Sequence, residues 1–272
     1  MKPTLNKDTR LCISLAARPS NFGTRFHNYL YNELDLDFIY KAFTTTDITA
    51  AVGGVRALDI RGCSVSMPFK EDVIALVDEL DASATAIQSV NTIVNDDGYL
   101  RAYNTDYIAA AQLIRASEID PATPFLLRGS GGMAKAVAAA LRDSGFTQGT
   151  IVARNEHSGR ALAGELGFRW LAELADERAP LIVNVTPVGM AGGAESDELA
   201  FPTDTIADAD TVFDVVALPA ETPLIVAARV AGKKVITGAE VIALQAAEQF
   251  ERYTGIRPTP EQVAEASEHA RA

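Results

Sequence analysis

The stretch from residue 125 to residue 134, FLLRGSGGMA, limits the possible folds of this chain more than its composition does. An apolar run of strand character leads into glycines, and an Ala-rich helical pattern follows. Gly129, Gly131 and Ala134 have the spacing G-x-G-x-x-A. In that spacing the first glycine permits a tight turn, the second lets the backbone approach a pyrophosphate, and the small third residue lets the helix pack on the sheet. Its position between strand and helix predicts a doubly wound, dinucleotide-binding parallel sheet.

The sequence after this turn continues the same pattern. Buried runs such as TIVAR, LIVNVT, TVFDVVA and KKVITG alternate with helical segments, as in parallel sheets covered on both faces. Arg154 ends the second run, where NAD-binding proteins carry an acidic residue for the ribose hydroxyls. An arginine can instead pair with a 2′-phosphate, so NADP is expected in preference to NAD, with an ordinary surface arginine as the alternative. Arg128, just before the turn, either serves phosphate binding or points to the surface.

The amino-terminal part reads as a second α/β unit. From residue 11 to about 105, short apolar runs alternate with helical patterns, and VNTIVNDDGYLRAY predicts a hairpin around Asp97-Gly98. We expect a first domain over residues 1–105 and a dinucleotide-binding domain over residues 106–238. Helices in residues 239–272 are expected to pack back on the first domain. The last one begins with a capping box at Thr259 and Gln262.

Composition excludes several kinds of partner. Lys and Arg total 24 against 36 Asp and Glu, and this formal charge of −12 disfavours nucleic acid. MKPTLNKDTR lacks the apolar core of a signal peptide, and no apolar run reaches the roughly 20 residues of a membrane span. The sequence predicts a cytoplasmic monomer or homodimer with no membrane partner. Cys12 and Cys63 are expected to be buried thiols. The histidines have no metal-ligand spacing, so no metal site is expected.

The segment SVSMPFK, residues 64–70, raises a separate question. Pro68 suits the first position of a helix, which would place Lys70 in the first helical turn. An ammonium there is mildly unfavourable, by up to about 1 kcal/mol. Lys70 is therefore either a tolerated surface lysine or a functional one. Asp106 is similarly ambiguous, because it could simply cap the helix that starts with YIAAAQL.

Taken together, the segments resemble the shikimate dehydrogenase family over nearly the whole chain. Members typically show N-V-T-x-P-x-K, V-N-T, Y-N-T-D-G, a glycine turn, N-A-T-P-x-G-M and a closing helix with Q-A. This chain has SVSMPFK, SVNT, YNTDY, GSGGMAKA, NVTPVGM and QA in the same order. The resemblance implies an amino-terminal substrate domain, a Rossmann-like NADP domain and a cleft between them. It also implies an oxidoreductase that moves a hydride between the nicotinamide and shikimate, quinate or a related ring carboxylate.

The resemblance also assigns site residues. Lys70 and Asp106 match the catalytic pair, in which the ammonium stabilises charge on the ring oxygen and donates a proton while the carboxylate holds the lysine. Asn91, Asn104 and Gln245 match positions that bind ring hydroxyls, for which neutral amides suit because they both donate and accept. The implied cofactor-binding residues are Gly129, Ser130, Gly131, Gly132, Met133, Ala134, Arg154, Asn184, Thr186, Met190 and Gly238.

The amino-terminal carboxylate site departs from the family pattern. The family reads H-S-x-S-P-x-x-H-N, and its two serines align with Asn21 and Gly23. Ser20, Thr24 or Arg25 could compensate, and His27 is expected to be a core residue. Ser64 and Ser66 replace Asn and Thr, and Ala217 stands in the place of a pocket tyrosine. Asn21 and Ser66 are still expected to contact substrate. The changes favour a paralogue with a related substrate, and the alternative is a ligand-sensing protein with little turnover.

Overall fold

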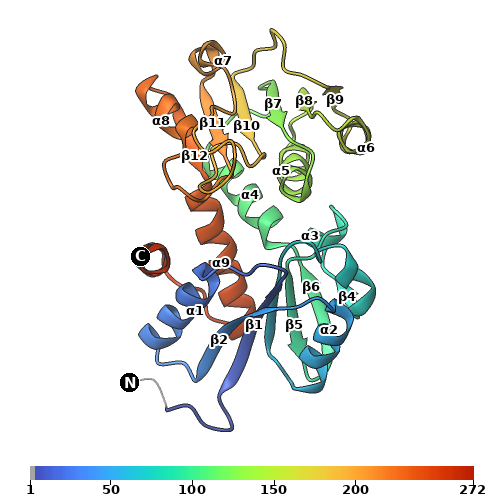
Figure 1. Cartoon of the computed structure of the whole chain (residues 1–272), viewed down its shortest axis with the longest axis vertical. Coiled ribbons are helices and arrows are strands. Elements are labelled where there is room, and N and C mark those ends of the chain that lie inside the picture. Colours follow the sequence, from blue (N-terminus) through green and yellow to red (C-terminus); the bar gives the residue numbers. More distant parts are fainter. Residues whose placement is uncertain (1–3) are drawn as a thin grey trace. The chain divides into compact units, whose positions relative to one another are not determined.

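The computed structural model describes residues 4–272 and divides them into two compact units (Figure 1). Unit 1 contains the chain up to Thr105 together with Ala243–Ala272, and unit 2 contains Asp106–Ile242. The second boundary lies inside helix α9 (Gly238–Thr254), a little beyond the expected Gly238. The two units are described one at a time.

Unit 1 is an α/β unit that changes from parallel to antiparallel pairing along its sheet. Its first elements are β1 (Arg10–Ala16), α1 (Phe22–Glu33), β2 (Phe38–Thr44), α2 (Ile48–Ala57) and β3 (Gly62–Val65). They are followed by η1 (Asp72–Leu76), β4 (Glu79–Leu80), α3 (Ala82–Thr85), β5 (Thr92–Asp96) and β6 (Tyr99–Tyr103). The strand order is β2-β1-β3-β5-β6-β4. β1 pairs in parallel with β2 and β3, whereas β5 is antiparallel to β3 and β6.

The predicted hairpin is confirmed. β5 and β6 are joined by Asp97 and Gly98, whose φ angles are 53° and 90°. Positive φ at both central residues is the requirement of the two-residue turn that matches the twist of paired strands.

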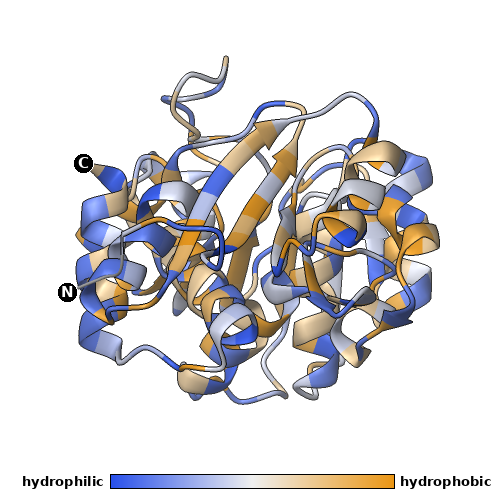
Figure 2. Ribbon diagram, turned by 90° about the horizontal axis from the view of Figure 1, so that it is seen from below, coloured by the Kyte–Doolittle hydropathy of each residue, from blue (hydrophilic) through white to orange (hydrophobic). Residues whose placement is uncertain are grey.

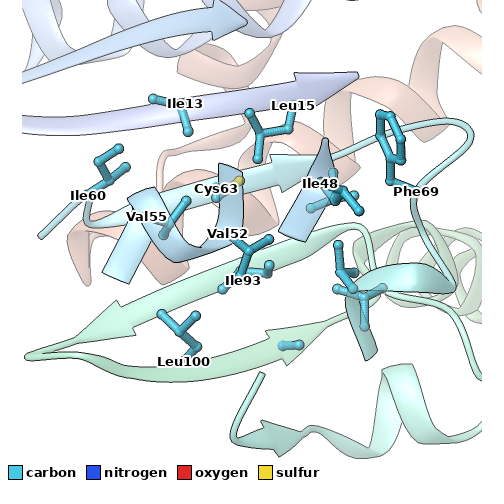
Figure 3. Packing of buried hydrophobic residues seen from close by; sticks show 14 of the residues in the cluster. Ile13, Leu15, Ile48, Val52, Val55, Ile60, Cys63, Phe69, Ile93 and Leu100 are labelled. Atoms are coloured by element: carbon cyan, nitrogen blue, oxygen red, sulfur yellow. The ribbon is translucent and has the colours of Figure 1, made fainter. Parts of the chain in front are cut away.

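The core of unit 1 lies between the sheet and α2. Figure 3 shows side chains of α2, among them Val52 and Val55, lying over residues from β1, β3, β5 and β6. Ile13 and Leu15 of β1 both belong to this cluster because alternate residues of a strand point to the same face. In the hydropathy colouring of Figure 2, hydrophobic segments run along the strands while the helices carry mixed colours.

Aromatic residues cover the other face of the unit 1 sheet. His27 of α1 is fully buried, as expected, and stacks on Tyr40 with ring centroids 4.4 Å apart. Tyr253 of α9 lies so close to β3 that a Cβ on Gly62 would be 2.2 Å from its ring, and only glycine permits this approach. The last helix, α10 (Pro260–Arg271), has the predicted capping box and packs on α1.

Unit 2 is the predicted doubly wound parallel sheet. Its helices are α4 (Thr105–Ala116, whose first residue belongs to unit 1), α5 (Gly132–Asp143), α6 (Glu156–Leu166), α7 (Thr203–Asp208) and α8 (Pro223–Val230). Its strands are β7 (Phe125–Arg128), β8 (Gly149–Val152), β9 (Arg169–Leu171), β10 (Leu181–Asn184), β11 (Thr211–Asp214) and β12 (Lys234–Thr237). The strand order is β12-β11-β10-β7-β8-β9, which reads 3-2-1-4-5-6 from the other edge when strands are counted within the unit. That is the Rossmann order, with its switch point between β7 and β10.

One local prediction was wrong, and one of the alternatives for Asp106 is excluded. Lys70 does not lie in a helical turn: residues 67–71 form a turn that contains a cis Met67–Pro68 peptide bond, and a short 3₁₀ helix begins only at Asp72. The physical reason is that the Lys70 carbonyl accepts a hydrogen bond from Val90 N–H at 2.8 Å. It therefore pairs with another segment of the chain and not with an N–H group one helical turn later. Asp106 is not a helix cap, because α4 already begins at Thr105.

Candidate functional site

The carboxyl edge of the unit 1 sheet gathers four of the predicted site residues. β1, β3 and β6 end at this edge and β5 begins there, because β5 runs antiparallel to its neighbours. Ser66 follows β3, Lys70 lies in the next turn, Asn91 precedes β5 and Asn104 follows β6. Val90 N–H donates to the Lys70 carbonyl at 2.8 Å, and Asn91 N–H donates to the carbonyl of Tyr103 at 3.1 Å. Phe69 N–H also donates to the Ser66 carbonyl at 3.1 Å, so backbone hydrogen bonds join each of these positions to another one or to its sequence neighbour.

The side chains of Asn91 and Asn104 are buried and held by hydrogen bonds. Each residue is 1% exposed. Asn104 Nδ2 donates to the Ser89 carbonyl at 2.9 Å, and Thr105 N–H donates to Asn91 Oδ1 at 2.8 Å. Asn91 Nδ2 is buried and has no hydrogen-bond partner within residues 4–272. A buried unpaired amide nitrogen costs about 1–3 kcal/mol, which a ligand oxygen would offset.

Helix α9 adds a further amide to this edge. Gln249 Nε2 donates to Thr92 Oγ1 at 3.1 Å and so ties α9 to the start of β5. The predicted residue Gln245 is half-buried and lies one helical turn earlier, on the same face of the helix. Sequence reasoning missed Gln249 and Thr92. The i, i+4 spacing of the two glutamines is the signal that could have found Gln249.

The residues expected near the carboxylate of the substrate make fewer hydrogen bonds than the buried amides. Asn21 is exposed just before α1 and does not cap it, and Ser66 is also exposed. A Cβ on Gly23 would lie 3.5 Å from Tyr40 Oη, an ordinary contact, so the missing serine side chain was not excluded by crowding. Thr24 Oγ1 is buried without a partner in the part of the chain that the structure describes. Arg25 is exposed. These side chains stay candidates for holding an anionic group.

The glycines in the turn of unit 2 differ in what they do: one is required by the packing of the chain itself, and the others leave the space that a ligand would need. Gly129 has φ +128°, and a Cβ there would be 2.9 Å from Val185 Cγ2 and 3.0 Å from the Val185 carbonyl oxygen. The chain's own packing therefore requires Gly129. A Cβ on Gly131 or Gly132 would meet nothing within 4 Å. Gly131 precedes α5 and supplies no side-chain cap, which leaves the first N–H groups of the helix for an anion. This geometry fits a pyrophosphate.

The remaining predicted residues around the glycine turn differ in exposure and contacts. Ser130 Oγ is 2.8 Å from Ser158 Oγ, at the start of α6, and Arg154 is exposed after β8. Ala134 is fully buried and Met133 is half-buried. Arg128 donates from Nη1 to the carbonyl of Ala200. Burial and, secondarily, the charge of Arg154 lower the pKa of Arg128.

A hydrogen-bonded cluster shapes the loop after β10. Asn184 Oδ1 accepts from Thr186 N–H at 3.0 Å and from Thr186 Oγ1 at 2.6 Å. Asn184 Nδ2 donates to Asp214 Oδ1 at 2.9 Å, and Asp214 Oδ2 accepts from Thr222 Oγ1 at 2.6 Å. Burial raises the pKa of Asp214, and hydrogen bonds from Thr222, Val216 and Asn184 oppose this shift. The sequence did not single out Asp214.

Two further predicted residues complete the carboxyl edge of unit 2. Met190 lies within the loop after β10 and is 42% exposed. Gly238 opens α9, and a Cβ there would lie 2.3 Å from the carbonyl group of Val216. The helix can start this close to the loop after β11 only because residue 238 is a glycine.

Comparison with known proteins decides the family. The family model described as the shikimate dehydrogenase substrate binding domain matches residues 22–93. A shikimate dehydrogenase-like protein of Haemophilus influenzae is 57% identical over 267 residues, which cover 98% of this chain and 98% of that protein. This chain belongs to the shikimate dehydrogenase family. The resemblance read from the sequence motifs is thereby confirmed.

Other members of the shikimate dehydrogenase family are similar to this chain at lower identity. The NADP-dependent shikimate dehydrogenase of Chlorobaculum tepidum is 36% identical over 250 residues, 84% of each chain. The crystal structure of shikimate 5-dehydrogenase from Thermus thermophilus in complex with NADP(H) and shikimate has a TM-score of 0.86 at 29% identity. The superposed region covers 96% of this chain and 99% of the Thermus thermophilus chain. The expected fold class is confirmed, and the chain falls in a family of NADP-dependent oxidoreductases.

Three other expectations bear on the site. Cys12 and Cys63 are buried free thiols, as predicted, and burial raises the pKa of Cys12 to about 12. Within residues 4–272 no cluster of three or more His, Cys, Asp or Glu side chains could hold a metal ion. No helix in the described part of the chain combines the length and apolar character needed to cross a bilayer.

Proposed function

We propose that this chain catalyses reversible, NADP-dependent hydride transfer to or from shikimate, quinate or a related ring carboxylate. In this proposal unit 1 holds the ring and unit 2 holds the dinucleotide. The observation that carries it is the buried Asn91 amide, whose nitrogen has no partner among the described residues and which adjoins the turn of Lys70 through Val90.

The cofactor part of the proposal uses the glycine turn. The N–H groups at the start of α5 would bind the pyrophosphate, and Arg154 would pair with the 2′-phosphate. Asn184, Thr186 and Met190 would border the nicotinamide. When bound, NADP supplies the ring that accepts or returns the hydride.

The substrate part assigns one chemical task to each side chain. The amides of Asn91, Asn104 and Gln245 bind ring hydroxyls and fix the orientation of the ring. The ammonium of Lys70 stabilises negative charge on the reacting oxygen and gives it a proton in the reduction, and takes the proton back in the oxidation. Asp106 pairs with Lys70 and holds its ammonium at that oxygen. Such general acid catalysis is typically worth about 10²–10⁴ in rate.

The rim of the site distinguishes this chain from the usual family pattern. With Asn21 and Gly23 in place of two serines, the substrate carboxylate must be held differently. Asn21 and Ser66 at the rim offer neutral donors, and Arg25 offers the natural ionic partner of a carboxylate. We therefore propose a substrate range that includes quinate and related acids alongside shikimate.

The test is NADP reduction followed at the nicotinamide absorbance band, with shikimate and quinate as substrates. Lys70→Met should lower kcat by about 100-fold or more while calorimetric NADP binding persists. Lys41→Met is the matched control, because Lys41 is an exposed lysine of β2 in the same unit, and it should keep wild-type turnover. Full turnover by Lys70→Met would remove the catalytic role of the lysine. Tight binding of ligand and NADP without turnover in the wild type would favour a ligand-sensing protein instead.

A further inference from the structure

We propose that Gln249 and Thr92 are positioning residues that lock the Asn91 amide with its nitrogen facing the ring substrate. This inference rests on the proposed function in one respect, namely that Asn91 contacts the ring. It concerns a hydrogen-bonded chain inside unit 1, from helix α9 through β5 to the start of α4.

A backbone group shows which terminal atom of the Asn91 side chain is the oxygen. Thr105 N–H lies 2.8 Å from one terminal atom of the Asn91 side chain. A backbone N–H can only donate, so that atom must be the oxygen. The other terminal atom is therefore the NH₂ group, and it is the atom left without a partner within residues 4–272.

The orientation of Thr92 follows from that of Asn91. Thr92 Oγ1 lies 2.8 Å from Asn91 Oδ1, which can only accept. Thr92 must therefore use its single hydroxyl hydrogen on Asn91. Its oxygen is left as an acceptor for its other close neighbour, Gln249 Nε2, at 3.1 Å. The Gln249 amide thus keeps the Thr92 hydrogen directed at Asn91.

The residues of this hydrogen-bonded chain are buried, so solvent does not compete for the hydrogen bonds between them. Asn91 is 1% exposed, Thr92 and Thr105 are 0% exposed, and Gln249 is 4% exposed. The Thr105 hydroxyl reinforces the same arrangement, since its Oγ1 lies 3.1 Å from Asn91 Oδ1 and 3.3 Å from Thr92 Oγ1. Without Gln249, the Thr92 hydroxyl could turn toward Thr105 instead, and Asn91 would lose a donor.

The functional consequence is a preference in the ligand. A locked NH₂ group at Asn91 requires an acceptor oxygen on the ring and rejects a ring that lacks one at that position. Loss of the Thr92 hydrogen bond leaves Asn91 Oδ1 held by Thr105 alone, so the amide is oriented less firmly. The ring substrate should then bind less tightly, while binding of NADP, which unit 2 is proposed to hold, stays unchanged.

The experiment compares isosteric variants. Thr92→Val keeps the shape of the side chain and removes the hydroxyl, whereas Thr92→Ser keeps the hydroxyl. We expect about a tenfold rise in KM for the ring substrate in Thr92→Val and in Gln249→Met, near wild-type KM in Thr92→Ser, and unchanged KM for NADP. The double variant Thr92→Val with Gln249→Met should be no worse than either single variant, because both break one chain. Thr254→Val is the control for a lost hydroxyl hydrogen bond in the same helix, and its KM should not change.

A second readout separates this inference from the proposed function. Nuclear magnetic resonance of ¹⁵N-asparagine-labelled protein follows the Asn91 side-chain NH₂ signal directly, without turnover. The inference predicts that this signal is shifted in Thr92→Val and Gln249→Met and close to wild type in Thr92→Ser. If the wild type turns over neither shikimate nor quinate, the proposed function fails, yet the signal still tests the lock. An unchanged NH₂ signal and unchanged KM in both Thr92→Val and Gln249→Met would overturn the inference.

Discussion

The carboxyl edges of the two sheets prepare for ligands in different ways. In unit 1 the candidate ligand-binding groups are buried side-chain amides, and hydrogen bonds hold Asn91 and Asn104 in one orientation. In unit 2 the glycine turn leaves space at Gly131 and Gly132 and offers backbone N–H groups. This difference matches our proposal that unit 1 holds a ring with several hydroxyls, which needs fixed directional donors, and that unit 2 holds a phosphate, which needs charge and room. Substitutions that remove hydrogen bonds should damage the first edge, and substitutions that fill space should damage the second.

The largest effect is expected at the Asp214 cluster, which is an exception to this contrast because it lies in unit 2 but depends on side-chain hydrogen bonds. Asp214→Leu leaves Asn184 Nδ2, Val216 N–H and the Thr222 hydroxyl without their acceptor, so it should lower the free energy of unfolding by about 3–5 kcal/mol. Asp214→Asn is the control, because it keeps an oxygen for Asn184 and Val216 and should cost less than half as much. Urea denaturation measures both. Equal losses in the two variants would mean that the cavity or charge, and not the acceptor, matters.

The glycine turn gives the sharpest test within unit 2. Gly129→Ala forces a Cβ against Val185 at a φ of +128° and should cost about 2–4 kcal/mol of stability. Gly131→Ala meets no atom, so it should change stability by no more than about 0.5 kcal/mol while weakening NADP binding. Thermal melting and calorimetry separate the two effects. Equal loss of stability in both variants would contradict the distinction between packing and ligand approach.

The buried imidazole of unit 1 gives a prediction for pH dependence. Burial lowers the pKa of His27 to about 3, and the nearby Gln249 side chain only partly opposes this. The unfolded chain binds the proton more tightly, so stability is full above pH 6.5 and falls as the pH drops toward 3. The expected loss from this group between pH 7 and pH 5 is about 2 kcal/mol.

His27→Phe provides the comparison for that measurement. Phenylalanine suits the aromatic surroundings of Phe26, Tyr40 and Phe250 and cannot take up a proton. Denaturation between pH 7 and pH 5 should therefore show a flatter profile than that of the wild type. An identical slope in both proteins would show that His27 is not the group responsible.

Much of the fold could be predicted from the sequence, because local patterns determined it. The glycine turn between FLL and the Ala-rich helix indicated the Rossmann unit, and Asp97-Gly98 indicated the hairpin. The turn at Lys70 could not be predicted, because its carbonyl is used by Val90, a residue distant in sequence. A proline-based helix signal describes only local preferences, and here a tertiary hydrogen bond prevailed.

The residues of the candidate site likewise fall into those that the sequence could indicate and those that it could not. Motif residues such as Asn91 and Asn184 were found because they stand in short recognisable segments. Gln249 and Asp214 were missed because their importance lies in a partner on another element, namely Thr92 and Asn184. The pairing of Lys70 with Asp106 joins residues of the two units and stays a prediction that only function or a complex can test.

The most direct measurement is a crystal structure of this protein with NADP and shikimate. The account predicts a ring hydroxyl within hydrogen-bonding distance of Asn91 Nδ2 and the reacting oxygen within hydrogen-bonding distance of the Lys70 ammonium, with Asp106 against that ammonium. A ring bound away from Lys70, or one that faces the oxygen of the Asn91 amide, would contradict it.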